Sequence, residues 1–207
     1  MNHIHPLQPI AVIVLAAILI YMNRKKFLRT PPPAPVVQAK AEDPPEVTYM
    51  KLRRQALEMD AGRFGGAAED PPYGALMEMG ISNSVVTLAC FADGDASVYY
   101  RTGGGMIGGV AHESVRKAAK EFVTLAQTAL PKMTAAAGSP LPGPDRVRFY
   151  VLTARGIFTT ETDRQALGQP QSELSTLFYS GQGVVTQMRQ VQERKSAGAA
   201  ESAAPKS

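Results

Sequence analysis

The first 22 residues show the most uniform hydrophobic pattern in the chain. From Ile10 to Met22 no residue carries a charge, and the apolar character begins at Pro6 and Leu7. A helix over 6–22 would be about 25 Å long, the short end of the length that crosses a bilayer core. The pattern therefore predicts a transmembrane helix over 6–22, after a short N-terminal segment. The alternatives are the apolar part of a secretory signal and a buried helix of a soluble core.

Lys and Arg residues follow this stretch directly, and none precedes it. The segment 23–29 contains no small-residue cleavage site, and its basic residues are Arg24, Lys25, Lys26 and Arg29. A secretory signal carries its positive charge in front, so the order here favours a membrane anchor. Because positive charge stays on the cytoplasmic side, these residues predict a single-pass protein with residues 1–5 outside and the remaining chain in the cytoplasm.

Two further segments lack the periodicity of a folded domain. Residues 30–47 hold six prolines and little apolar content, which predicts an extended linker. Pro32 and Pro35 also form a P-x-x-P pattern, so a ligand for SH3-like modules is an alternative. Residues 194–207 are mostly Ala, Ser, Gly, Lys and Glu, and we expect a disordered tail there. The folded domain is thereby confined to 48–193.

Within this domain the pattern alternates between helical and strand periods. A first helix, ended near Gly62, is indicated by apolar residues at helical spacing: Tyr49, Leu52, Ala56 and Met59. Residues 73–81 form a short apolar run, which we interpret as a strand. An apolar run over 85–92, the turn pair Asp93-Gly94 and an alternating segment over 96–102 predict a β-hairpin.

The second half of the domain begins with a strongly amphipathic helix. Its apolar residues over 115–130 oppose a polar face, and Pro131 ends it. After a loop rich in Pro and Gly, the segments 147–153 and 157–160 predict a second hairpin, and apolar residues over 174–191 predict a closing helix. This order predicts an α+β domain in which an antiparallel sheet of about five strands is packed with helices.

The succession of hairpin, helix, hairpin and terminal helix resembles the profilin-like group, which includes roadblock/LC7 and longin domains. The likeness covers roughly 73–193, and it departs from roadblock domains in placing three strands before the middle helix where they have two. Resemblance to roadblock domains implies homodimerisation and regulation of small GTPases or motors. The chain also resembles an uncharacterised bacterial membrane-anchored family in three segments: YGALMEMG, YYRTGGGMIGGVAHESVRKAAKEF and VRFYVLT. This second resemblance implies no activity and no site residues.

The basic segment 23–29 accounts for the net positive charge of the chain. The chain carries 22 Lys and Arg residues against 18 Asp and Glu, a formal charge of +4. Four of the cations lie in 23–29, which leaves 18 cationic and 18 acidic residues in the remaining chain. The excess therefore favours a lipid bilayer as partner and speaks against nucleic acid.

Few residues suit metal or nucleophile chemistry. The single cysteine, Cys90, excludes an intramolecular disulfide and multi-cysteine metal sites, and we expect it to be buried in a strand. Two of the three histidines, His3 and His5, lie at the N-terminus. Glu161 and Asp163 could bind a cation, although a solvated turn is the simpler interpretation. We expect no metal, no cofactor and no catalytic residue.

The one candidate ligand site is a glycine-rich segment between a strand and the middle helix. It consists of Gly103, Gly104, Gly105, Gly108 and Gly109, followed by His112 and Glu113. The glycines formally satisfy G-x-G-x-x-G, and a helix N-terminus beside glycines can bind phosphate. The preceding hairpin is antiparallel, however, which disfavours a dinucleotide site. A glycine-lined bend is the structural alternative.

Two hypotheses about function follow. The leading one is a cytoplasmic interaction or scaffolding domain without catalytic activity, held by the membrane anchor and binding a protein partner or a second copy of itself. The alternative is a phospholigand-binding or hydrolytic domain that uses the glycine segment with His112 and Glu113 as base and acid.

Overall fold

The computed structural model describes residues 43–64, 71–168 and 173–203. The predicted span 6–22, the segments 1–5 and 23–29 on either side of it, and most of the linker lie outside these residues. Among the described helices, none combines the length and the apolar character needed to cross a membrane. The anchor and its orientation remain predictions.

All described strands belong to one antiparallel sheet. The five long strands are those that the sequence predicts: β1 (Gly74–Ile81), β2 (Ser84–Phe91), β3 (Ala96–Tyr100), β6 (Arg146–Thr153) and β7 (Gly156–Asp163). Two further strands have two residues each: β4 (Gly105–Met106), which pairs with β3, and β5 (Thr134–Ala135), which pairs with β7. The strand order in the sheet is β4-β3-β2-β1-β6-β7-β5. The sheet therefore has seven strands rather than about five, and its short outer strands cover part of each edge.

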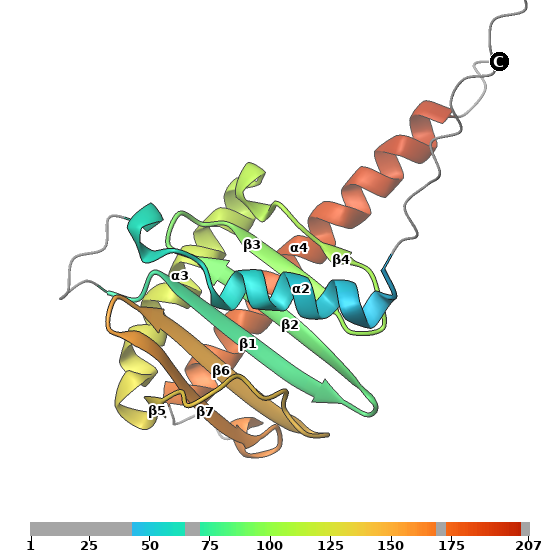
Figure 1. Cartoon of the computed structure of the whole chain (residues 1–207). Helices are drawn as coiled ribbons and strands as arrows, with labels where there is room; N and C mark the ends of the chain where they lie inside the picture. Colours follow the sequence, from blue (N-terminus) through green and yellow to red (C-terminus); the bar gives the residue numbers. More distant parts are fainter. Residues whose placement is uncertain (1–42, 65–70, 169–172, 204–207) are drawn as a thin grey trace, which may run out of the picture. The chain divides into compact units, whose positions relative to one another are not determined.

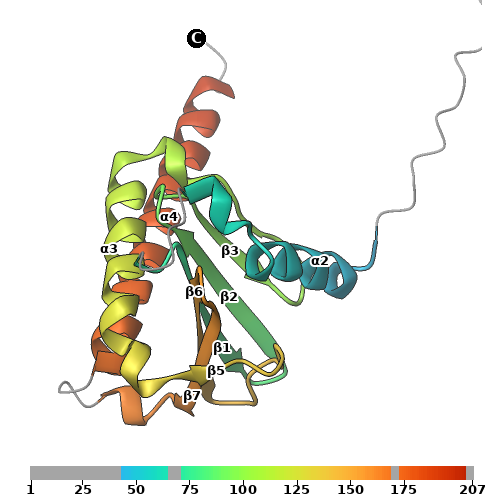
Figure 2. The same ribbon diagram turned by 60° about the vertical axis from the view of Figure 1, so that its left-hand side comes forward.

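The described α-helices lie on both faces of this sheet. They are α2 (Pro45–Leu57), α3 (Glu113–Ala129) and α4 (Glu173–Ala203). Figures 1 and 2 show α3 and α4 side by side on one face and α2 on the opposite face. Short 3₁₀ helices are η1 (Ala61–Phe64), η2 (Gly109–Ala111), η3 (Leu130–Lys132) and η4 (Ala166–Gly168). The predicted α+β class with an antiparallel sheet is confirmed.

The face under α3 and α4, called the inner face below, is apolar. Alternate strand residues such as Met77, Leu88 and Phe149 are fully buried against Phe122 of α3 and Leu177 of α4. The approach of α4 depends on Gly181. A Cβ there would lie 2.7 Å from the Cε of Met77 and 3.1 Å from the Phe122 ring.

The opposite face, called the outer face below, is covered by α2 and by the long loop 136–145. Tyr49 and Leu57 of α2 pack against Leu76, Tyr150 and Leu152 of the sheet. The loop crosses β1 so closely that a Cβ on Gly80 would meet the carbonyl oxygen of Gly143 at 1.9 Å. The alternation of strand residues thus gives the sheet two buried faces, each with its own core.

Two predicted boundaries are wrong. α2 starts at Pro45, inside the range 30–47 assigned to the linker, because a proline in the first turn loses no intrahelical N–H bond. At the other end α4 continues to Ala203, so 194–203 are helical where the sequence predicts a disordered tail. Alanine has the highest helix propensity of all residues, which is consistent with this extension.

Candidate functional site

The glycines of the predicted ligand site each have a place in the local backbone. Gly103 and Gly104 have positive φ angles and form the turn between β3 and β4. Gly105 lies in β4, where a Cβ would be 2.3 Å from the carbonyl oxygen of Val98. Gly108 also has a positive φ, and a Cβ on Gly109 would lie 2.6 Å from the Val115 side chain. This geometry favours the bend over a phosphate loop.

His112 and Glu113 stand at the start of α3 but do not face a sizeable cavity. His112 occupies the N-cap position without a side-chain cap bond, and Glu113 is exposed and pairs with Arg116. The cavity beside His112 has a volume of about 40 Å³ and is bordered by Ile107 and Lys195. That volume has room for only a few water molecules, far less than a phosphorylated metabolite needs.

The other candidate residues predicted from the sequence are buried or take part in structural ion pairs. Cys90 is buried, and burial together with the nearby Asp95 raises the pKa of its thiol well above the usual range. Glu161 accepts hydrogen bonds from Arg146 and Arg148, and Asp163 accepts one from Arg146. Within the described ranges no group of three or more His, Cys, Asp or Glu residues suits a metal ion. The membrane-orienting residues 24–29 lie outside the described ranges.

A groove that the sequence does not reveal lies on the outer face. It has a volume of about 300 Å³ and runs between one side of α2 and the segment 136–139. Its helix wall is formed by residues at spacings of three and four: Met50, Arg53, Arg54, Leu57 and Glu58. Its other walls are Ala136, Ala137, Gly138, Ser139, Tyr150 and Ile157. The surface is mainly apolar, with polar groups at the floor and the rim.

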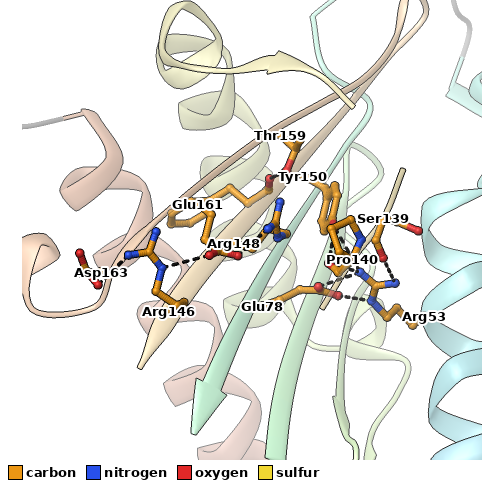
Figure 3. A network of polar contacts seen from close by, with 11 residues as sticks. Arg53, Glu78, Ser139, Pro140, Arg146, Arg148, Tyr150, Thr159, Glu161 and Asp163 are labelled. Atoms are coloured by element: carbon orange, nitrogen blue, oxygen red, sulfur yellow. Dashed lines mark hydrogen bonds and ion pairs between the residues drawn. The ribbon is translucent and has the colours of Figure 1, made fainter. Parts of the chain in front are cut away.

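The floor of the groove holds a buried ion pair between Arg53 of α2 and Glu78 of β1. Only 2% of Arg53 and none of Glu78 is exposed. Arg53 Nε donates to Glu78 Oε1 at 2.6 Å, and Arg53 Nη2 donates to Glu78 Oε2 at 2.9 Å, as Figure 3 shows. Burial acts to lower the pKa of Arg53, but the hydrogen bond and charge of Glu78 outweigh it and raise this pKa. The pair is a two-pronged, charge-assisted contact that fixes how α2 lies on the sheet.

The other polar groups around this pair satisfy one another. Arg53 also donates from Nη1 to the carbonyl oxygen of Ser139 at 2.9 Å, and its guanidinium lies 5.5 Å from the Tyr150 ring centre. The Tyr150 hydroxyl donates to the Pro140 carbonyl oxygen at 2.7 Å (Figure 3). The loop at 139–140 is thereby bonded to both α2 and the sheet, so the ion pair sets the shape of the groove on both sides.

Behind the ion pair, Thr87 and Tyr49 complete the network. Thr87 Oγ1 donates to Glu78 Oε1 at 3.1 Å, and it lies 2.8 Å from the Tyr49 hydroxyl. Because the Thr87 hydroxyl has one proton, the Tyr49 hydroxyl is the donor to it. Burial, reinforced by the Glu78 charge, raises the pKa of Tyr49 to about 12. The floor therefore combines one buried charge pair with neutral phenols.

The sheet register explains why these residues meet. Thr87, Glu78, Arg148 and Glu161 lie directly opposite one another across β2, β1, β6 and β7, so all four side chains point to the outer face. Arg148 Nη2 donates to Glu161 Oε2 at 2.5 Å, while its buried Nε has no partner among the described residues. Charges thus alternate along one row of the sheet, and only Glu78 has its partner on α2 (Figure 3).

One sequence signal could have pointed to this site. Glu78 is the single charged residue in the apolar strand GALMEMGI. A buried carboxylate in such a strand requires a cationic partner, since an unpaired buried charge is very costly. The signal does not identify Arg53, because 25 residues separate the two in sequence and α2 carries two other cations, Lys51 and Arg54.

Comparison with protein-family models, with curated proteins and with solved structures found no match to this chain. The resemblance to profilin-like domains stays a prediction from the order of elements.

Proposed function

We propose that this chain is a membrane-anchored interaction protein whose cytoplasmic domain binds a short apolar segment of another protein in the groove beside α2. The observation that carries the proposal is the groove itself, an open space of about 300 Å³ with mainly apolar walls. Met50 at its rim is an exposed large apolar side chain of α2, and methionine adapts readily to the shape of a partner.

The charges around the groove support an uncharged occupant. Arg53 at the floor is neutralised by Glu78. Arg54 and Glu58 at the rim are both exposed and of opposite sign, so the rim has no net charge. A phosphorylated or strongly acidic ligand would find no excess of positive charge here, whereas an apolar peptide segment would cover Met50 and Leu57.

The polar groups of the groove support binding rather than catalysis. The donors of Arg53 are directed at Glu78, Ser139 and Pro140, and the Tyr150 hydroxyl is directed at Pro140. Groups that satisfy one another in this way hold the walls in place and are not free to transfer protons to a substrate. The groove is therefore a shaped, pre-organised surface, which lowers the ordering cost of binding.

Site-specific photo-crosslinking tests the proposal. A photoreactive amino acid is placed at Met50 of the full chain in cells, the adduct is purified, and the partner is then produced and its affinity for the full chain measured. Gly138→Trp places a large side chain in the groove, at a position where a Cβ meets no atom within 4 Å. We expect this variant to weaken binding at least about tenfold, as loss of a central apolar contact does.

The matched control is Gly198→Trp, which adds the same side chain at another open position on α4. It should bind the partner like the native chain. Equal affinities for Gly138→Trp and Gly198→Trp would show that the groove is not the binding surface.

A further inference from the structure

The most exposed of the large apolar side chains in the described ranges lies in the glycine segment. Ile107 is 69% exposed, and Val110, three residues later, is 40% exposed. These two side chains are called the loop tip below. Their neighbours Met106 and Gly109 are turned toward the domain, so the fold itself does not use the loop tip.

The backbone holds the loop tip clear of the domain. A Cβ on Gly108, the residue after Ile107, would meet no atom within 4 Å, so the backbone is open on this side of Ile107. Its base is fixed, because Gly105 pairs with Tyr99 in the sheet and Gly109 lies against Val115. An apolar tip on a fixed base can bind a surface without a large ordering cost.

Two cationic side chains lie beside the loop tip, and one of them, Arg116, also pairs with Glu113. Lys195 of α4 borders the same small cavity as Ile107, and Arg116 of α3 donates to the carbonyl oxygen of Val110 at 3.3 Å. The helix segments from which these two side chains come, 113–121 and 189–195, together contain six Lys and Arg residues and three Glu residues. Exposed aliphatic side chains beside an excess of cations are typical of surfaces that bind anionic lipid.

The start of α2 lies beside the turn between β3 and β4, which precedes the loop tip in the chain. A Cβ on Gly103 would lie 3.0 Å from the Cβ of Pro45, the first residue of α2, and Arg101 pairs with Glu46. The chain that precedes α2 contains the predicted membrane span. The preceding chain therefore joins the domain beside the turn between β3 and β4.

We propose that the loop tip inserts into the surface of an anionic bilayer and holds the domain against the membrane that anchors it. Two aliphatic side chains bind a membrane weakly by themselves, but the anchor raises their effective concentration at the surface. Gly108 allows the tip to project, and the other glycines of the segment serve the β3–β4 turn and close backbone contacts, so the segment is explained without a phosphate ligand. The proposal rests on the anchor of the proposed function, and it does not depend on the groove.

Tryptophan fluorescence gives a direct test, because the chain contains no tryptophan. The full chain with Ile107→Trp is incorporated into vesicles of phosphatidylcholine and phosphatidylserine, in which the phosphatidylcholine carries bromine on its acyl chains. We expect the bromine to quench about half of the emission, as for a side chain at the acyl boundary. The matched control is Tyr179→Trp, an exposed position of α4 about 18 Å along the helix from Val191 beside the cavity.

Quenching of Ile107→Trp no greater than that of Tyr179→Trp would overturn the proposal, as would equal quenching in vesicles without phosphatidylserine. A blue-shifted but unquenched emission would mean that a protein surface covers the tip, and it would overturn the proposal as well. Retention of the chain on vesicles under alkaline carbonate reports the anchor separately. A retained chain with an unquenched Ile107→Trp therefore rejects the loop contact alone.

A second measurement keeps Ile107 native, since a new tryptophan can itself favour a membrane. Acylation of Lys195 by a water-soluble reagent is compared with that of Lys132, which lies beyond the opposite end of α3. In the native chain, phosphatidylserine vesicles should lower the Lys195/Lys132 ratio severalfold relative to detergent micelles. The variant Ile107→Ser with Val110→Ser should lose this protection, and protection that persists in it would contradict the proposal.

Discussion

The two faces of the sheet are stabilised in different ways. The inner face meets α3 and α4 through an apolar core that includes Met77, Phe122 and Leu177. The outer face meets α2 through apolar contacts and through the buried Arg53–Glu78 pair. Apolar packing tolerates small shifts of its partners, whereas a two-pronged ion pair requires one arrangement.

This difference indicates that the two faces contribute differently to the stability and to the position of the helices. The inner face has the larger core and is expected to supply most of the stability. A buried ion pair contributes little net stability compared with apolar residues of the same size, but it can fix the position of an element. On the outer face that element is α2, which forms one wall of the groove. We interpret the ion pair as the contact that keeps the groove in shape.

The largest expected effect on stability comes from removing only the cation of the Arg53–Glu78 pair. Arg53→Met leaves the Glu78 carboxylate buried without a cation, and we expect the free energy of unfolding to fall by about 3 to 5 kcal/mol. Replacing both residues, as Arg53→Met with Glu78→Leu, should restore stability to within about 1 kcal/mol of the native chain. Urea unfolding of the full chain in nanodiscs measures both values.

The inner face provides the contrast. Leu177→Ala should lower the free energy of unfolding by about 2 to 5 kcal/mol by leaving a cavity, and no polar partner exists whose removal would compensate. If the double variant of the outer face were as unstable as Arg53→Met, the difference between the faces would not lie in the buried charge.

Alkaline pH should weaken the outer face selectively. The unfolded Tyr49 phenol ionises near pH 10, while burial keeps it protonated in the folded chain until about pH 12. Its stabilising contribution, about 2 to 3 kcal/mol, is therefore complete below pH 10 and is lost as the pH rises to about 12. Unfolding curves of Tyr49→Phe should decline less steeply over this interval than those of the native chain. Burial likewise raises the pKa of Tyr99 and Tyr150, so part of the decline should remain.

The control for this titration is Tyr179→Phe, which removes a hydroxyl from the exposed surface of α4. Its stability should follow that of the native chain at every pH. An unchanged decline in Tyr49→Phe would mean that Tyr49 does not link stability to pH.

Replacing either of two glycines of α4 by alanine should change the stability of the chain, but in opposite directions. Gly181→Ala brings a methyl group against Met77 and Phe122, and we expect a loss of about 1 to 2 kcal/mol. Gly183→Ala points into open space and should gain about 0.5 to 1 kcal/mol from helix propensity. Thermal unfolding of the two variants measures the difference. Equal changes would show that α4 does not approach the inner face as closely as described.

Local patterns predict most of the fold. The apolar face over 115–130, the Asp93-Gly94 turn and the alternation over 96–102 each reflect contacts between residues close in sequence. The two-residue strands escape prediction because they have no periodicity of their own. Composition favours the linker for Pro44 and Pro45, although a proline at the first helical position is compatible with a helix.

The groove could not be predicted in the same way. It depends on Arg53, Glu78 and Ser139, which come from α2, β1 and the loop before β6 and meet only in the folded chain. Conversely, the glycine segment satisfies a phosphate-binding pattern by spacing alone, while the structure uses its glycines for turns and close backbone contacts. The spacing of residues along the chain describes the local backbone. A site on a sheet face depends instead on how strands and helices far apart in sequence are paired.

The most direct test of the central claim compares crosslinking from the two sides of the domain. A photoreactive amino acid is placed either at Met50 beside the groove or at Gln127 on the exposed surface of α3, and the yield of adducts is measured in membranes that contain the full chain. We predict a specific adduct from Met50 that Gly138→Trp abolishes, and none from Gln127. An adduct from Gln127 with none from Met50 would place the binding surface on the helix layer and contradict the account.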